Sequence, residues 1–164
     1  LAGGDDAAVP GEAAKLLTVR PRADILAFQQ ILWNLMAESF RDPLWGAAYM
    51  INGGCSDDGF AYFRAWLIGQ GRAVFERAVD DPDALADLPT VQEAAEDWRD
   101  DFDNEEVLSI AWDAYRMAFG EELPQDCWTV TYPDLRDGWD FEDWAETRRR
   151  LPRLAALYER HYAD

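Results

Sequence analysis

A chain of 164 residues is long enough for one domain that buries about 70% of the surface its unfolded form exposes. Hydrophobic residues make up 49% of the chain, with eight Trp and eight Phe, so we expect a packed domain rather than a disordered one. The net charge of −18 disfavours nucleic acid and anionic membranes as partners, because both are bound through Lys and Arg, and no apolar run approaches the roughly 18 residues of a membrane-spanning helix.

Helical patterns begin after a polar lead-in. Residues 1–9 are rich in Gly, Asp and Ala, and we expect them to be disordered. A short helix is expected over residues 10–17. From residue 21 to about residue 40, apolar residues recur every three or four positions, which predicts one buried helix face. That face consists of Ile25, Phe28, Leu32, Leu35 and Met36.

The next helix is marked at both ends. Asp42 and Pro43 are typical of a helix start, with the carboxylate as N-cap and proline at the first helical position, where its missing N–H costs nothing. Asn52, Gly53 and Gly54 end the helix, because these residues adopt left-handed backbone conformations readily. The pattern predicts a helix followed by a glycine turn.

A second helix follows the turn. Ser56 is the expected N-cap, and the carboxylates of Asp57 and Asp58 in the first turn favour the helix dipole. Gly71 is expected to end this helix. Its buried face is predicted to consist of Phe60, Phe63, Trp66 and Leu67.

These two helices carry a resemblance to a known family. The chain resembles the bacterial domain-of-unknown-function family DUF-4240, closely in this stretch and more loosely over residues 21–123. The resemblance implies a helical fold and a bacterial, cytoplasmic setting, and it supplies no catalytic residues. Members of that family begin with an extra amphipathic helix containing a Phe-Trp pair, which we expect to be missing here. The matching residues are Trp45, Ala48, Tyr49, Ile51, Asn52, Gly53, Gly54, Ser56, Asp57, Asp58, Phe60, Phe63, Arg64, Trp66, Leu67, Ile68 and Gly71.

The remainder of the chain predicts more helices around one irregular segment. Helices are expected over about 72–80, 83–88, 90–98, 103–119, 141–150 and 152–162. Residues 120–140, with two Pro and one Gly after the first position, predict a loop that holds at most one short strand, over 127–132. We therefore expect a single, compact, all-α domain of about seven or eight helices. Its core is expected to include Trp33, Trp66, Trp98 and Trp112.

The residue types needed for common catalytic and metal sites are scarce. His161 is the only histidine, and Cys55 and Cys127 lie far apart without a Cys-x-x-Cys spacing. No phosphate-binding glycine loop or nucleophile motif is present in the sequence. We therefore predict no catalytic residues, no metal site and no cofactor.

The best-marked polar group follows the glycine turn. One interpretation is structural: the two aspartates favour the helix N-terminus, and Arg64 pairs with Asp42 or Asp57 to tie helix to loop. The other is a small polar pocket, which a carboxylate- or metal-assisted hydrolase would use. The residues of that candidate pocket are Trp45, Tyr49, Asn52, Asp57, Asp58 and Arg64.

An acidic stretch provides a third candidate. Residues 80–106 contain twelve Asp or Glu against one Arg, whereas residues 147–164 carry a net charge of +3. Internal pairing with Arg148, Arg149 and Arg150 would offset part of this charge. Alternatively, the stretch forms a docking surface for a basic protein. The predicted acidic surface consists of Asp100, Asp101, Asp103, Glu105 and Glu106.

From the sequence alone we favour a cytoplasmic, acidic protein-binding or regulatory module over the hydrolase. The reason is that the chain carries a large net negative charge and that its sequence contains no assembled catalytic motif. The expected partner is a basic protein, with neither nucleic acid nor membrane involved. The sequence leaves the oligomeric state open.

Overall fold

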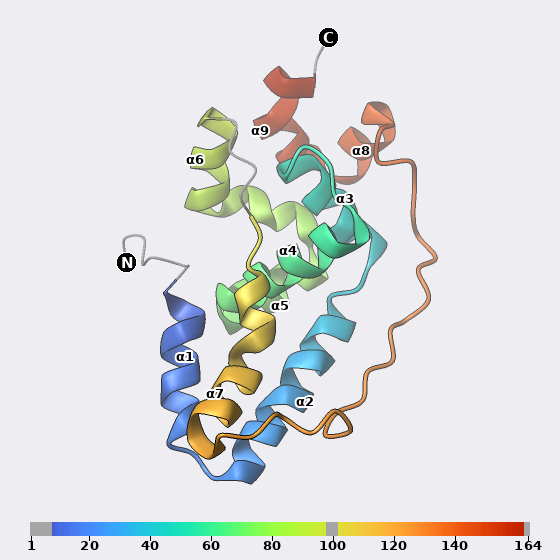
Figure 1. Cartoon of the computed structure of the whole chain (residues 1–164). Coiled ribbons are helices and arrows are strands. Elements are labelled where there is room, and N and C mark those ends of the chain that lie inside the picture. Colours follow the sequence, from blue (N-terminus) through green and yellow to red (C-terminus); the bar gives the residue numbers. More distant parts are fainter. Residues whose placement is uncertain (1–7, 98–101, 163–164) are drawn as a thin grey trace.

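The computed structural model describes residues 8–97 and 102–162. Within these residues all regular secondary structure is helical, which confirms the predicted all-α class (Figure 1). The expectations for residues 1–7 and for Trp98 lie outside the described residues. The disordered lead-in predicted for residues 1–9 is wrong at Val9, which begins α1. The elements are α1 (Val9–Thr18), α2 (Arg22–Glu38), α3 (Asp42–Ile51), α4 (Asp57–Gly69), α5 (Arg72–Asp80), the 3-10 helix η1 (Pro82–Asp87), α6 (Pro89–Asp97), the 3-10 helix η2 (Glu105–Ser109), α7 (Ile110–Phe119), α8 (Trp144–Arg150) and α9 (Pro152–Tyr162).

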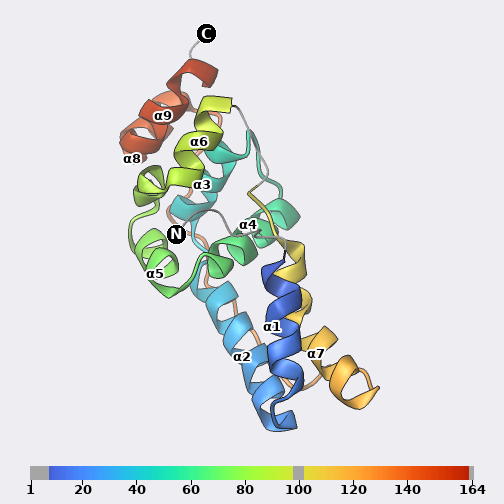
Figure 2. The ribbon, with the colours of Figure 1, turned by 90° about the vertical axis from the view of Figure 1, so that its left-hand side faces the viewer.

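Helix α4 lies between two groups of helices. On one side α1, α2 and α7 pack against one another, and on the other side α3, α5, α6, α9 and η1 enclose the larger core (Figures 1 and 2). Phe60, Phe63 and Leu67 of α4 are fully buried in that larger core, while Ala65 belongs to the smaller one. The predicted apolar face of α4 is therefore confirmed. Since α4 contributes to both cores, it connects the two halves of the molecule.

The turn before α4 has the predicted chemistry. Gly53 follows the end of α3 with a φ of 63°, a left-handed conformation that costs glycine little. Ser56 caps α4, because its Oγ accepts a hydrogen bond from the backbone N–H of Gly59 at 3.1 Å. Asp57 and Asp58 occupy the first turn. The local sequence thus determines where α4 begins.

The start of α3 differs from the prediction. Asp42 is the first helical residue rather than the N-cap, which is Arg41. The Asp42 carboxylate is buried and accepts a hydrogen bond from the backbone N–H of Asp137 at 3.0 Å. A side chain expected to cap its own helix instead holds a segment 95 residues further along the chain.

That distant segment is extended. Residues 124–142, which we call the strap, run along α2 and α3 and lead from the end of α7 to α8 (Figure 1). The short strand allowed for residues 127–132 does not form, because no second strand in the described chain pairs with the strap. The strap instead inserts aromatic side chains between the helices. One of them, Trp128, contacts Trp33 and Trp112. Both of these tryptophans, expected in the core, are half-buried even with this cover.

Candidate functional site

Two acidic segments meet at Tyr62 on α4. The hydroxyl of Tyr62 donates to Glu105 Oε1 at 3.2 Å, and the carbonyl of Tyr62 accepts from the backbone N–H of Asn104 at 3.1 Å. The charge of Glu105 raises the pKa of Tyr62 above its ordinary value, and Asp58 and Asp103 act in the same direction. The start of α4 and the start of η2 therefore place their carboxylates around one tyrosine.

We call Tyr62, Asp58, Asp103 and Glu105 the acidic cluster. Its three carboxylate residues are exposed, as are their sequence neighbours Asp57 and Glu106. Within the described part of the chain, none of these five acidic residues forms an ion pair with Lys or Arg. Asp100 and Asp101, the other members of the predicted acidic surface, lie outside the described residues.

Asn52 supports the loop that leads into this cluster. Its side-chain Nδ2 donates to the carbonyl of Phe102 at 3.2 Å. Phe102 is buried, and its ring packs edge-on against Trp66 with centroids 4.9 Å apart. The chain immediately before Asp103 is thus fixed to the core, which restricts where the carboxylates of Asp103 and Glu105 can lie.

Trp45 and Tyr49 contact the strap through the ring of Phe141. Trp45 donates from Nε1 to the carbonyl of Cys55 at 3.0 Å and stacks on Phe60 at 4.7 Å. The hydroxyl of Tyr49 donates to Glu142 Oε1 at 3.3 Å. Burial and then the charge of Glu142 raise the pKa of Tyr49. Both residues therefore contribute to packing between α3 and its neighbours.

Arg64 is directed into the protein. It is 3% exposed and donates from Nε to the carbonyl of Phe60 at 3.2 Å and from Nη1 to the carbonyl of Met36. Because Met36 lies in the last turn of α2, the guanidinium satisfies a carbonyl at the negative end of that helix.

Three aromatic rings surround the same guanidinium. Its central carbon lies 5.0 Å from the ring centroid of Phe40, 4.7 Å from that of Phe60 and 5.5 Å from that of Tyr132. Burial lowers the pKa of Arg64. The ion pair expected with Asp42 or Asp57 is wrong, since the described residues give Arg64 carbonyls and aromatic rings as partners instead.

The six residues of the predicted polar pocket differ in their exposure and in the groups that they contact. Asp58 belongs to the exposed acidic cluster and Asp57 is its exposed neighbour, whereas Arg64 is buried beneath Tyr132. Trp45, Tyr49 and Asn52 make packing and loop contacts. Cys55, near Arg64, is a poor nucleophile at neutral pH because burial raises the pKa of its thiol to about 11. Both cysteines are free, and among the described residues no group of three or more His, Cys, Asp or Glu side chains is arranged to hold a metal ion.

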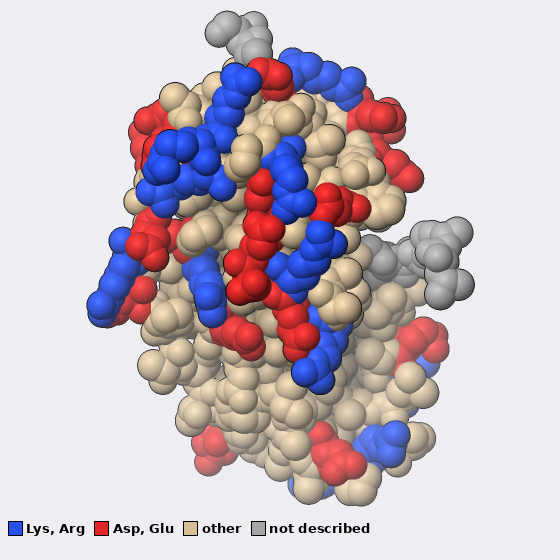
Figure 3. Space-filling model, turned by 180° about the vertical axis from the view of Figure 1, so that it is seen from behind, with Lys and Arg blue, Asp and Glu red and all other residues tan. Residues whose placement is uncertain are grey.

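The first part of the acidic stretch is neutralised internally. Asp83 accepts from the backbone N–H groups of Arg153 at 3.0 Å and Leu154 at 2.9 Å, so it caps the start of α9 from another element. The Arg153 side chain also pairs with Asp81 at 2.9 Å and with Asp87 at 3.0 Å, and Arg77 pairs with Asp87 as well. Acidic and basic side chains are accordingly intermixed over the upper half of the face in Figure 3.

The arginines expected to neutralise the stretch have other partners. Arg149 and Arg150 pair with Glu146, both at 2.6 Å, and Arg148 pairs with Glu159 at 3.2 Å. The expected pairing of these three with residues 80–106 is therefore wrong. Their partners lie within α8 and α9, where helical spacing brings Glu146 beside both arginines.

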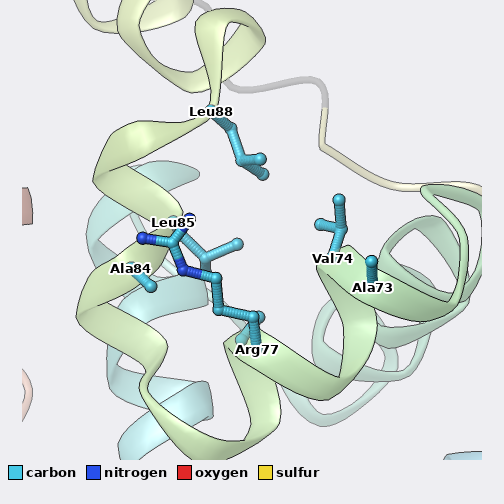
Figure 4. A pocket seen from close by; sticks show the side chains of 7 residues that line it. Ala73, Val74, Arg77, Ala84, Leu85 and Leu88 are labelled. Atoms are coloured by element: carbon cyan, nitrogen blue, oxygen red, sulfur yellow. The ribbon is translucent and has the colours of Figure 1, made fainter.

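Sequence reasoning missed a small apolar pocket between α5 and η1. Its cavity volume is about 190 Å³, and Arg77 extends across it between the two elements (Figure 4). This volume is below the roughly 300–1,000 Å³ of typical small-molecule sites. Apart from Arg77 the lining is apolar, so the pocket offers no acid, base or nucleophile. The lining residues are Ala73, Val74, Arg77, Ala78, Ala84, Leu85 and Leu88.

In the described residues no helix has both the length and the apolar character needed to cross a bilayer.

Comparisons with known proteins agree with the resemblance seen in the sequence. Neither the curated proteins nor the solved structures include a match to the chain. The family model described as "Protein of unknown function (DUF4240)" matches residues 1–117, which include α1 to α6 and the acidic cluster, so the chain belongs to the DUF4240 family.

Proposed function

We propose that this protein is an interaction module that docks a basic protein partner on its acidic cluster. The observation that supports this proposal is the convergence of Asp58, Asp103 and Glu105 around Tyr62 from two separate elements. A bacterial, cytoplasmic setting, in which the module has a binding or regulatory role, is part of the same proposal.

The physical argument is electrostatic. Like charges gathered on one surface repel one another, and arginine or lysine residues of a partner would relieve that repulsion while gaining charge-assisted hydrogen bonds. The cluster also offers the ring of Tyr62, a residue type enriched among those that dominate interface energies. Exposed charges are screened over about 8 Å at physiological ionic strength, so binding must weaken as salt rises.

The geometry favours this reading over the hydrolase alternative. A carboxylate-assisted reaction would need the carboxylates of Asp57 and Asp58 and the guanidinium of Arg64 to reach a common substrate. The two aspartates are exposed, whereas Arg64 is 3% exposed and bonded to carbonyls of α2 and α4. The carboxylates of Asp57 and Asp58 therefore face solvent, whereas the guanidinium of Arg64 lies inside the protein, away from any substrate bound at the surface.

The test uses a labelled synthetic peptide that contains arginine at several positions, with binding followed by fluorescence anisotropy. A cluster variant combines Asp58→Asn, Asp103→Asn and Glu105→Gln. A matched control combines Glu12→Gln, Asp113→Asn and Glu121→Gln, which removes the same charge from residues that already pair with Lys15, Arg116 and Arg22.

We expect the cluster variant to lose affinity by about tenfold or more and the control variant to lose much less. The native protein should also bind progressively more weakly as salt is raised. Equal losses in the two variants would mean that net charge alone attracts the peptide, and the proposal would then be wrong. Salt-independent binding would contradict it as well.

A further inference from the structure

The strap lies on the surface of helices α1 to α7, which we call the helical body. None of its residues, 124–142, is fully buried, and the chain is fully buried again only at Thr147. No backbone–backbone hydrogen bond among the described residues joins the strap to helices α1 to α7. The strap is therefore held by side chains, in the way that a bound peptide is held.

Side chains of α2, α3 and α8 bind the backbone of the strap; from α8, Arg150 donates to the carbonyl of Asp137 at 3.1 Å. Gln30 of α2 donates from Nε2 to the carbonyl of Thr129 at 2.8 Å, and Gln30 Oε1 accepts from the N–H of the same residue at 2.9 Å. Asp42 accepts from the N–H of Asp137 at 3.0 Å. Contacts to backbone groups do not depend on the side chains of the bound segment, so they would serve another extended segment equally well.

The first half of the strap packs two aromatic rings against aromatic side chains of the helical body. Trp128 stacks on Trp33, with centroids 6.2 Å apart and planes within 8°, and meets Trp112 edge-on at 5.8 Å. Four residues later, Tyr132 packs on Phe40 at 4.8 Å and covers the Arg64 guanidinium. Tyr132 remains 38% exposed, so even this contact is made at the surface.

The second half of the strap inserts two more rings against α3. Trp139 packs directly on Gly46: a Cβ atom there would lie 2.4 Å from the indole ring, so this approach requires glycine. Phe141 packs on Tyr49 at 5.7 Å and on Trp139 at 4.9 Å. The helical body thus presents aromatic sites at intervals along an extended chain, with backbone contacts between them.

The limit of the family match lies between the α2–α3 face and the strap that covers it. The residues of α2 and α3 that hold the strap, among them Gln30, Asp42 and Gly46, lie within the matched residues 1–117, and the whole strap lies beyond them. Thr147 and Arg150 of α8, which also contact the strap, follow it in the chain and lie beyond the match as well. We infer that the α2–α3 face is a binding site for an extended, aromatic-rich segment of a partner protein. The strap occupies this site in cis, and a partner segment with aromatic residues at similar spacing takes its place.

Because the strap belongs to the same chain as the site, it competes with any added peptide. An occupant joined to the same chain acts at an effective concentration in the millimolar range, so an added peptide competes poorly with it. Weakening the strap should therefore reveal binding of the same peptide in trans. Because this face is separate from the acidic cluster, failure of this inference would leave the proposed function untouched.

The probe is a labelled synthetic peptide with the sequence of residues 124–142, added to the full-length chain. The strap-weakened variant combines Trp128→Ala and Tyr132→Ala. We expect it to bind the peptide at least about tenfold more tightly than the native chain does, because its own strap competes less strongly for the site. A peptide whose four aromatic residues are replaced by Ala should not bind.

Variants of the site itself provide the matched controls. Gln30→Leu, added to the strap-weakened chain, should abolish binding because it removes both contacts to the backbone. Gln92→Leu on α6, far from the strap in sequence and bonded to Ala86, should leave binding unchanged. Gly46→Ala should reduce binding, since the added methyl group occupies the position of the Trp139 ring.

Several results would overturn the inference. One is a strap-weakened variant that keeps its helical circular dichroism but does not bind the peptide. Another is a dimer of that variant in size-exclusion chromatography, which would assign the face to the strap of a second copy. Should the variant fail to fold, hydrogen exchange of the native chain decides: we expect the amides of Thr129 and Asp137 to exchange faster than those of α4. If the amides of Thr129 and Asp137 exchange only when those of α4 also exchange, the strap does not separate from the core and the inference is wrong.

Discussion

Replacing Arg64 with Met measures what a buried guanidinium contributes to this fold. The substitution keeps a long apolar side chain but removes the hydrogen bond to the Met36 carbonyl and the contacts with three aromatic rings. A hydrogen bond to a charged group contributes about 1.5–3 kcal/mol, and a desolvated cation–π contact about 2 kcal/mol. Taken alone, these losses would lower the free energy of unfolding by roughly 3–5 kcal/mol.

An opposing effect reduces this figure. Arg64 is 3% exposed and has no carboxylate partner among the described residues, so burying its charge costs several kcal/mol that Met would not incur. We expect the contacts to outweigh the desolvation cost, because the Met36 carbonyl would otherwise be buried without a donor of comparable strength. The net expected loss is about 1–3 kcal/mol for Arg64→Met. Arg64→Ala should lose more, because it also leaves a cavity.

The assay is urea denaturation followed by circular dichroism. Arg72→Met is the matched control, since Arg72 has an 87% exposed side chain that pairs within its own helix with Glu76. That variant should change the free energy of unfolding by less than about 0.5 kcal/mol. An Arg64→Met protein as stable as the parent, or more stable, would show that desolvation prevails and that Arg64 does not stabilise the end of α2.

The other predictions concern single side chains. Ser56→Ala should lower the free energy of unfolding by about 0.5–2 kcal/mol, because the N–H of Gly59 loses its acceptor; unchanged stability would contradict the cap. Phe63→Ala should lower it by about 3–5 kcal/mol, since the ring is fully buried, and a loss below about 1 kcal/mol would place it outside the core. Asp83→Ala should lower it by about 1–3 kcal/mol and expose α9 to proteolysis, because two N–H groups at the start of α9 lose their acceptor. Burial raises the pKa of Cys55 from 9.0 to about 11, so the unfolded chain loses this proton first and stability should fall as pH rises above 9.0; rapid alkylation of native Cys55 near neutral pH would contradict this.

The sequence was informative wherever structure depends on neighbouring residues. The cap at Ser56, the glycine turn at residues 52–54 and the spacing of Phe60 and Phe63 each act within one or two turns, and all are present as predicted. The resemblance to the DUF4240 family depended on the same residues and is confirmed. Local signals therefore located the centre of the fold.

The errors concern contacts between distant residues. Asp42 has the sequence context of an N-cap, yet its partner is 95 residues away. Arg64 follows the carboxylates of Asp57 and Asp58 in sequence, but α4 turns it inward to a carbonyl of α2. The β-favouring residues 127–132 are extended without forming a strand, because the strap lies against helices rather than beside another strand. Each outcome depends on tertiary packing that propensity does not encode.

The candidate site was only partly accessible from sequence for the same reason. Asp58 and the group formed by Asp103 and Glu105 could each be identified, but 45 or more residues separate them along the chain. Tyr62 was not singled out, although it is the residue at which they meet. A tyrosine four residues after an acidic helix start is a weak signal, since it is equally consistent with simple packing.

The most direct test of the proposed docking surface is an amide NMR titration of the full-length protein with the arginine-containing peptide. We expect the largest chemical-shift changes at Tyr62, Asn104 and Glu105, with little change around Glu12 and Asp113, and we expect these changes to diminish as salt is added. Shifts spread evenly over the exposed carboxylates, or concentrated between Asp81 and Asp87, would contradict the acidic cluster as the site of docking.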